Sequence, residues 1–192
     1  MGLVGWFASQ SLISGRGLKE GGIGDGIHEL CAPWHRWLLA HPRCADAVLI
    51  VSSACIDLLG IFLIGVSVFG PSMRPFAAMI VLFLMRQACQ AVCALPTPPG
   101  MIWRYPGFPS LLVTYDVAND FFFSGHTSIA VLAAIVAAGM FPWWAGAAFA
   151  LIALGEASVV LIVRAHYTLD VFTAVVAAFC ADRMADWLCA AL

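Results

Sequence analysis

The sequence predicts an all-α polytopic membrane protein, a transmembrane helical bundle of five to six spans. The chain is 62% hydrophobic and only 10% charged, with a mean hydropathy of +0.95. A soluble domain usually carries about 25% charged residues, so this balance suits hydrocarbon better than water. The apolar runs of the chain each approach the roughly 20 residues that an α-helix needs to cross a bilayer. The net charge of −2 argues against a basic, nucleic-acid-binding surface.

Residues 1–44 are expected to form an N-terminal interfacial or amphipathic segment, ahead of a transmembrane catalytic bundle over residues 45–192. The segment is rich in glycine and mixed in polarity. Its stretch IHELCAPWHRWLLAH places Trp34 and Trp37 beside Arg36. Tryptophan next to basic residues is typical of a helix that lies in the membrane surface rather than across it.

The bundle itself is predicted from five apolar runs, at about 47–69, 75–95, 126–141, 143–163 and 170–191. The turns after the first and third runs are so short that the spans they join must be antiparallel neighbours. Alternation of spans then puts the start of the third, the end of the fourth and the start of the fifth at one membrane surface. We find no internal repeat and no domain boundary within these runs.

The longest connection, residues 96–123, is rich in proline and aromatic residues. Long connections without secondary structure of their own are usually functional. Trp103, Tyr105, Phe108 and the run 121–123 are expected to exclude water and admit lipid, with the three phenylalanines as the lipid-side wall of a site. A cage for a quaternary ammonium group and an aromatic belt at the interface are both open explanations of these residues.

The third span begins with Ser124, Gly125, His126 and Thr127. Serine at a helix N-cap satisfies free amide donors, and the same helix end attracts phosphate. Glycine lets an anion approach the backbone closely. His126 in the first turn is placed to donate a proton to a leaving oxygen. By itself the motif is weak evidence, because serine and glycine commonly begin helices.

A second polar stretch, RAHYTLD, begins the fifth span with His166 and Asp170 four residues apart. On a helix they would share a face, and a carboxylate on one imidazole nitrogen leaves the other nucleophilic. Arg164 adds a cation that can bind phosphate. Together with His126 these groups suit phosphoryl transfer through a phosphohistidine, with no metal ion or other cofactor. Metal ligation by the two histidines and Asp170 is the alternative, which the nearby arginine disfavours.

Three ionisable residues fall inside the predicted spans: Asp57, Arg86 and Glu156. Charges within a membrane are usually paired or functional. Asp57 and Arg86 are at similar depth and are expected to pair, with a structural role and a role in the site both open. Glu156, two turns from Arg164, is expected to support that guanidinium group.

Three stretches of the chain resemble the sphingomyelin synthase-like branch of the type-2 phosphatidic acid phosphatase superfamily. They are MRQACQAVCALPTPPGM at 85–101, NDFFFSGHT at 119–127 and RAHYTLDV at 164–171. The resemblance implies that His166 is the nucleophile, that Asp170 orients it and that His126 protonates the departing alcohol.

The same stretches contain further residues that are predicted to contact phosphate or substrate: Arg86, Asp120 and Tyr167, beside Ser124, Gly125, Thr127 and Arg164. The resemblance also implies a six-span bundle that transfers phosphocholine or a related headgroup from a phospholipid donor to a lipid alcohol acceptor. Ceramide and diacylglycerol are both open as acceptors, since plant phosphatidylcholine:diacylglycerol cholinephosphotransferases share the two histidine motifs. The sequence departs from the branch in showing five convincing spans and no recognisable proline-rich segment before the first.

Two other functions are open. The same site with water as acceptor would be a metal-independent lipid phosphate phosphatase or a phospholipase C-type hydrolase. A non-enzymatic membrane transporter or scaffold is the other, although an inverted repeat, common in transporters, is missing. The protein is expected to be integral and multi-pass. Its lysines and arginines favour a cytoplasmic site, whereas the resemblance favours the opposite side, and the oligomeric state is open.

Overall fold

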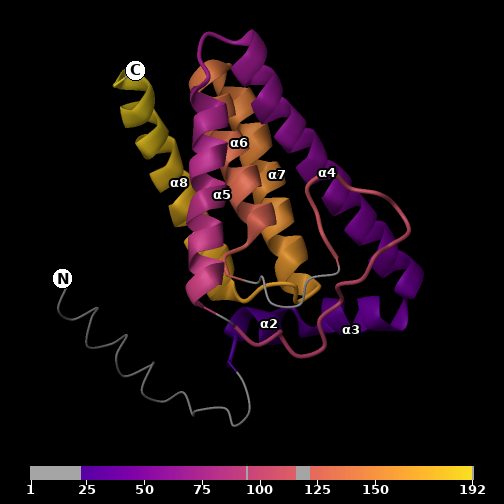
Figure 1. Ribbon diagram of the computed structural model, residues 1–192. Helices are drawn as coiled ribbons and strands as arrows, with labels where there is room; N and C mark the ends of the chain where they lie inside the picture. The colour runs from indigo at the N-terminus through magenta and orange to yellow at the C-terminus, as the bar shows by residue number, and fades with distance from the viewer. Residues whose placement is uncertain (1–22, 94, 116–121, 192) are drawn as a thin grey trace, which may run out of the picture.

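The computed structural model describes residues 23–93, 95–115 and 122–191, and every regular element within them is an α-helix (Figure 1). The long helices are α4 (Pro42–Phe69), α5 (Arg74–Val92), α6 (Gly125–Met140), α7 (Trp143–Ile162) and α8 (Thr168–Ala190). They correspond one to one to the five apolar runs, and α4 begins at Pro42 rather than at residue 47. The predicted fold class, an all-α helical bundle, is confirmed.

Helix α6 lies at the centre of the bundle and contacts each of the other four long helices. Its inner side consists of small or branched residues, and Ala130, Leu132 and Ala133 are completely buried. Small side chains let neighbouring helices approach closely without a hydrophobic driving force in lipid. At the α6–α7 contact a Cβ on Gly146 would lie 2.8 Å from the Cα of Ala138. The sequence of α6 therefore specifies a core helix.

Three helices, α4, α5 and α7, are long and apolar enough to cross a membrane by length and composition. Helix α6 is apolar but has 16 residues. Helix α8 has 23 residues and carries Asp182, Arg183 and Asp186 in its second half. The protein is thus an integral membrane protein with several apolar helices, and the count of five to six spans stays a prediction.

Two short helices, α2 (Gly26–Leu30) and α3 (Ala32–Ala40), lie across the end of the bundle at which α7 ends and α8 begins (Figure 1). Trp34 and Trp37 on α3 are more than half exposed, whereas His28 and His35 are buried. The segment therefore has one exposed and one buried side, and its place at the membrane interface stays a prediction.

The short turns join antiparallel neighbours, since α4 contacts α5 and α6 contacts α7. As a result, the start of α6, the end of α7 and the start of α8 lie at the same end of the bundle (Figure 1). This is the arrangement predicted from the alternation of spans. It brings both histidine motifs to one surface.

The predicted pair between Asp57 and Arg86 is wrong. The Asp57 carboxylate accepts hydrogen bonds of 2.9 Å from the Ser110 hydroxyl and from the backbone N–H groups of the next two residues. Arg86 donates from Nε to the carbonyl oxygen of Phe123 at 3.0 Å. Hydropathy places two residues at one depth, but the direction in which each points around its helix depends on packing.

The predicted support of Arg164 by Glu156 is also wrong. The Ser52 hydroxyl donates to Glu156 Oε2 at 2.6 Å, so this carboxyl group faces α4 inside the bundle. Arg164 points to the opposite side of the α7–α8 turn. There it donates to the carbonyl oxygens of Pro99 at 2.9 Å and His28 at 3.5 Å.

Candidate active site

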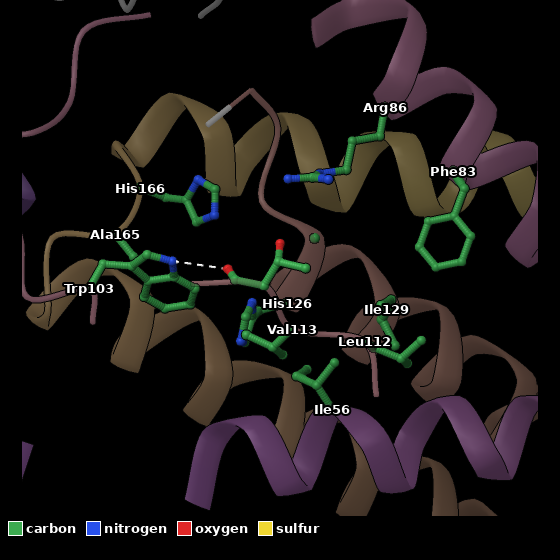
Figure 2. A pocket seen from close by; sticks show the side chains of 12 residues that line it. Ile56, Phe83, Arg86, Trp103, Leu112, Val113, His126, Ile129, Ala165 and His166 are labelled. Atoms are coloured by element: carbon green, nitrogen blue, oxygen red, sulfur yellow. Dashed lines mark hydrogen bonds between the residues drawn. The ribbon is translucent and has the colours of Figure 1, made fainter. Parts of the chain in front are cut away.

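A cavity of about 80 Å³ opens at the end of the bundle where the two histidine motifs meet (Figure 2). It is formed by the middle of α4, the second half of α5, the start of α6, the α7–α8 turn and the loop after α5. Its lining residues are Ile56, Phe83, Arg86, Trp103, Leu112, Val113, Thr114, Gly125, His126, Ile129, Ala165 and His166. Four of the predicted site residues, Arg86, Gly125, His126 and His166, therefore share one cavity.

The start of α6 holds His126 in place. Ser124 is the N-cap of this helix, and its Oγ accepts hydrogen bonds from Thr127 N at 3.3 Å and from Thr127 Oγ1 at 3.0 Å. Both side chains are completely buried. They cap the helix rather than line the cavity, and this fixes the first turn in which His126 lies. The ring of His126 meets the ring of Trp103 edge-on, with centroids 5.4 Å apart.

His166 lies in the α7–α8 turn, just before α8 begins at Thr168. Asp170 is completely buried in the first turn of α8, where its Oδ2 accepts a hydrogen bond of 2.8 Å from Tyr167 N. The same oxygen lies 3.7 Å from His166 Nδ1. The carboxylate is therefore on the Nδ1 side of the imidazole ring, which suits the predicted role of an orienting group. The two residues face each other although His166 is not helical.

Arg86 extends from α5 over the start of α6 towards His166 (Figure 2). A Cβ on Gly125 would lie 3.5 Å from Arg86 Nε and 3.7 Å from its Cζ. The guanidinium group thus lies within ordinary van der Waals distance of the first turn of α6, close to the helix N-terminus. A cation and a helix N-terminus next to each other form a favourable place for a phosphate group.

The other predicted phosphate ligands lie elsewhere. Arg164 does not line the cavity, because its guanidinium group faces Pro99 and His28. Tyr167 is buried at the N-cap of α8 with its ring stacked on His28 at a centroid distance of 5.7 Å. Asp120 lies outside the described residues. Arg86 is the arginine that the structure brings to the two histidines.

The predicted wall of phenylalanines is also different from the one observed. Phe121 lies outside the described residues. Phe123 is 1% exposed and belongs to the hydrophobic core, and Phe122 packs against that core. The loop contributes Trp103, Leu112 and Val113 to the cavity instead. Trp103 is fixed by its Nε1, which donates to the Thr114 carbonyl oxygen at 3.3 Å (Figure 2).

The α7–α8 turn is held by residues that sequence reasoning missed. His28 donates from Nε2 to the His166 carbonyl oxygen at 2.9 Å, and His35 donates from Nδ1 to the Ile162 carbonyl oxygen at 2.8 Å. A carbonyl oxygen only accepts, so these contacts define which ring nitrogen carries the proton. His28 and His35 are seven residues apart on the amphipathic segment, a spacing that puts them on one helical side. That spacing is the signal in the sequence that would have found them.

Asp25 adds a second link to the same place. Its carboxylate accepts hydrogen bonds from Thr168 N at 2.6 Å and Thr168 Oγ1 at 2.7 Å, as well as from two N–H groups of α2. Burial of the carboxyl group opposes ionisation, but the hydrogen bonds from Thr168 and His28 outweigh it and lower the pKa of Asp25. One carboxylate therefore caps both α2 and α8.

Within the described residues, no group of three or more histidine, cysteine, aspartate or glutamate side chains is arranged to hold a metal ion. His126, His166 and Asp170 are thus not placed together as a ligand set. Among the described residues, the groups at the cavity that can take part in chemistry include the imidazoles of His126 and His166 and the guanidinium group of Arg86, with the buried Asp170 carboxylate beside His166.

The family model AtPDCT1/2 matches residues 25–187 of the chain. The chain belongs to this family. AtPDCT1/2 is a family of the phosphatidic acid phosphatase type-2 superfamily, which contains membrane lipid phosphotransferases and phosphatases. The superfamily predicted from the histidine motifs is confirmed, and the match does not support the sphingomyelin synthase branch.

This AtPDCT1/2 member is also similar in fold to a solved structure, the crystal structure of LpxE from Aquifex aeolicus. The TM-score is 0.56 at 16% sequence identity, and the match covers 73% of this chain and 84% of that one. At this identity the likeness concerns the fold alone. No curated protein matches the sequence.

Proposed function

We propose that this protein transfers a phosphocholine headgroup from phosphatidylcholine to diacylglycerol through a covalent intermediate on His166. The observation that carries the proposal is the meeting of His126, His166 and Arg86 in one cavity at the end of the bundle. The three residues come from α6, the α7–α8 turn and α5, so only the folded bundle brings them together. Membership of the AtPDCT1/2 family, whose name denotes phosphatidylcholine:diacylglycerol cholinephosphotransferases, supports this donor and acceptor.

Phosphate binding falls to Arg86 and the start of α6. The guanidinium group provides a permanent cation with planar donors that match phosphate oxygens. The first turn of α6 adds the positive end of the helix dipole beside Gly125. Donors fixed before the reaction stabilise the charge that builds on the phosphorus oxygens in the transition state.

In the first step, His166 attacks phosphorus with Nε2, since Asp170 lies on the Nδ1 side. A bond forms between Nε2 and phosphorus, and the bond from phosphorus to the glycerol oxygen of the donor breaks. His126 gives its proton to that oxygen, and diacylglycerol leaves. The proton that His166 carries on Nδ1 stays there, stabilised by the Asp170 carboxylate.

In the second step, the hydroxyl group of the acceptor lipid attacks the phosphorus of the phosphohistidine. His126, now neutral, takes the hydroxyl proton, and the bond from phosphorus to Nε2 breaks. The product carries the headgroup, and both histidines return to their first protonation states. Water in place of the lipid alcohol would give free phosphocholine by the same steps.

The walls of the cavity favour a lipid acceptor over water. Ile56, Phe83 and Ile129 line it from three helices, and Trp103 and Val113 line it from the loop. These apolar side chains stand beside the polar groups of the cavity and fit the hydrocarbon next to a lipid hydroxyl group. Hydrolysis is therefore the minor reaction in this proposal.

The test uses purified protein in vesicles with choline-labelled phosphatidylcholine, a distinguishable diacylglycerol and a chelator of divalent metals. Ceramide replaces diacylglycerol in a parallel sample. His166→Ala is compared with wild type, and His41→Ala is the matched control. His41 is exposed and does not line the cavity, and its Nδ1 donates to the Trp37 carbonyl oxygen of its own segment.

We expect labelled phosphatidylcholine built on the added diacylglycerol in wild type and His41→Ala. In His166→Ala the rate should fall by about 10³-fold or more, the order seen when a nucleophile is removed. Transfer of phosphocholine to ceramide but not to diacylglycerol would show that the acceptor is a sphingolipid. Release of free phosphocholine without transfer would show that the protein is a hydrolase. Undiminished transfer in His166→Ala would refute the mechanism.

A further inference from the structure

Helix α4 carries a stripe of residues that receives the loop segment 104–115, here called the re-entrant hairpin. The stripe consists of Asp46, Leu49, Ser53, Asp57 and Gly60, whose spacing of three or four residues places them on one side of the helix. Its members contact the hairpin in order along the helix. Arg104 donates to Asp46 Oδ1 at 2.6 Å, and the Tyr115 hydroxyl group contacts Ser53 Oγ and the Leu49 carbonyl oxygen.

The tip of the hairpin is fixed by Asp57 and Gly60. Three donors converge on the Asp57 carboxylate at 2.9 Å: the Ser110 hydroxyl group and the N–H groups of Leu111 and Leu112. One turn further along α4, a Cβ on Gly60 would collide with Leu112 Cδ1. Leu112 thus fills the space that the glycine leaves open. A hydrogen-bonded carboxylate and a fitted side chain hold the same two residues of the hairpin.

These contacts lie well along α4 at the surface of the bundle. Asp57 follows Asp46 by eleven residues, so at 1.5 Å per residue it lies about 16 Å further along the helix. This is about half of the 30 Å hydrocarbon thickness. At such a depth neither a carboxylate nor a backbone N–H group finds water, and irregular backbone is tolerated only where protein satisfies it. Asp57 and the hairpin tip therefore satisfy each other.

The hairpin forms one wall of the cavity described above. Leu112, Val113 and Thr114 line the cavity on the inside. Leu112 and Val113 lie near Ile56 of α4 (Figure 2). On the outside, Leu111 is 78% exposed. The hairpin is thus a single layer of chain between the cavity and the outside of the bundle beside α4. The stems of the hairpin reach the end of the bundle at Arg104, so release of the tip would open a passage for water along α4.

We propose that Asp57 is a positioning residue that selects the acceptor, because it holds the re-entrant hairpin on α4 as the wall that keeps water from the cavity. The proposal rests on the proposed function, since it concerns the competition between a lipid hydroxyl group and water for the same phosphohistidine. Asp57 itself touches neither substrate nor the reacting atoms. Its effect is on what reaches them.

The experiment measures the ratio of free phosphocholine to transferred phosphocholine in three variants. Asp57→Asn removes the charge and one of the two acceptor oxygens at the tip. Gly60→Ala displaces Leu112 and leaves the carboxylate in place. Gly65→Ala, on the same helix, is the matched control, because a Cβ at Gly65 meets no atom within 4 Å. Gly60→Ala also keeps the proposal testable if Asp57→Asn does not fold.

A second measurement follows the hairpin without using activity. Leu111→Cys is made in a chain whose native cysteines are replaced by alanine or serine, with Asp57 intact or changed to Asn. The rate of reaction with a membrane-impermeant maleimide reports the exposure of position 111 to water, since the reactive thiolate needs an aqueous environment.

We expect the hydrolysis ratio to rise about tenfold in Asp57→Asn, the change that corresponds to loss of one charge-assisted hydrogen bond. Gly60→Ala should also raise this ratio, and Gly65→Ala should have the same ratio as wild type. The labelling of position 111 should accelerate about tenfold in the Asp57→Asn background. Faster labelling with an unchanged ratio would show that the hairpin does not select the acceptor. An unchanged labelling rate would show that Asp57 does not hold it. If the wild-type protein transfers no headgroup, the proposed function is refuted, and acceptor selection by Asp57 is refuted with it. If wild type transfers normally and all variants show the same ratio of free to transferred phosphocholine, only the role of Asp57 is refuted.

Discussion

Asp25 offers a direct test of how the N-terminal segment supports the site. Its Oδ1 accepts from Ile27 N, His28 N and Thr168 Oγ1, and its Oδ2 accepts from Thr168 N. Asp25→Asn keeps an oxygen that can cap α2. In place of Oδ2 it puts an amide nitrogen, a donor, against the donor Thr168 N. The substitution therefore removes the backbone hydrogen bond from Thr168 N to Asp25, and it leaves the hydroxyl contact of Thr168 and the local cap of α2.

The structure sets the size of the effect. A buried N–H group that loses its acceptor costs about 1–3 kcal/mol, and a lost charge at a helix N-terminus costs about 0.3–1 kcal/mol. Because Asp25 is only partly buried, we expect Asp25→Asn to lower the free energy of unfolding by about 1–2 kcal/mol. Asp25→Ala, which also removes the cap of α2, should lose about 1 kcal/mol more. For a chain of this size the melting temperature falls by about 2–4 °C per kcal/mol.

The effect has a defined pH dependence. The pKa of Asp25 is lowered in the folded protein from its ordinary value of 3.8, since the hydrogen bonds outweigh burial. A lowered carboxyl pKa contributes stability that is fully present above the unfolded value and is lost as pH falls through the folded value. The difference between wild type and Asp25→Asn should therefore be constant from about pH 5 to 8 and shrink below about pH 4.

Thermal unfolding in detergent, followed across this pH range, measures both expectations. Headgroup transfer should also weaken in Asp25→Asn, because Thr168 lies two residues after His166. His41→Ala is the control, since His41 is exposed and its Nδ1 hydrogen bond stays within its own segment. Equal melting temperatures for Asp25→Asn and wild type at pH 7 would refute the reasoning. So would a stability difference that grows as the pH falls below 4.

Two further substitutions test the packing away from the site, both by thermal unfolding in detergent. Arg74→Ala should destabilise the protein by about 2–4 kcal/mol, because it leaves the buried carboxylate of Asp182 without its cation. Arg183→Ala, which removes a largely exposed partner of Asp186, should change stability by less than about 0.5 kcal/mol, and equal effects of the two variants would contradict this. Gly146→Ala should destabilise by about 1–3 kcal/mol, because its Cβ would overlap Ala138 of α6. Gly155→Ala, on the same helix with no atom within 4 Å of its Cβ, should be neutral or stabilising, and a loss as large as that of Gly146→Ala would argue against close α6–α7 packing.

The elements of the bundle were predictable because hydrocarbon imposes a length and a composition on each span. Alternation of spans then placed His126 and His166 at one end, and the structure has them lining one cavity. The direction in which a residue points around its helix was not predictable in this way. Asp57 and Arg86 have the expected depth, yet they bind the hairpin tip and the Phe123 carbonyl oxygen. Hydropathy measures depth, and only tertiary packing decides the partner.

The same distinction explains the two arginines near the histidines. Arg164 is two residues before His166 in sequence, and proximity along the chain favoured it as the phosphate ligand. In the α7–α8 turn, however, Arg164 has a φ of 57°, which turns its side chain and that of His166 to different sides. A non-glycine residue rarely adopts this conformation without compensating contacts. Here the hydrogen bonds from Arg164 to Pro99 and His28 provide them.

The backbone around His166 is held at three carbonyl groups by two separate segments of the chain. A helix ends with carbonyl groups that lack intrahelical partners. At the end of α7, the Ile162 carbonyl oxygen accepts from His35, and the Val163 carbonyl oxygen accepts from Ile102 N at 2.8 Å. The His166 carbonyl oxygen accepts from His28. The N-terminal segment and the loop after α5 therefore supply the donors that α7 lacks, and in doing so they fix the turn that carries the proposed nucleophile. A segment outside the apolar runs therefore positions the turn on which the proposed mechanism depends.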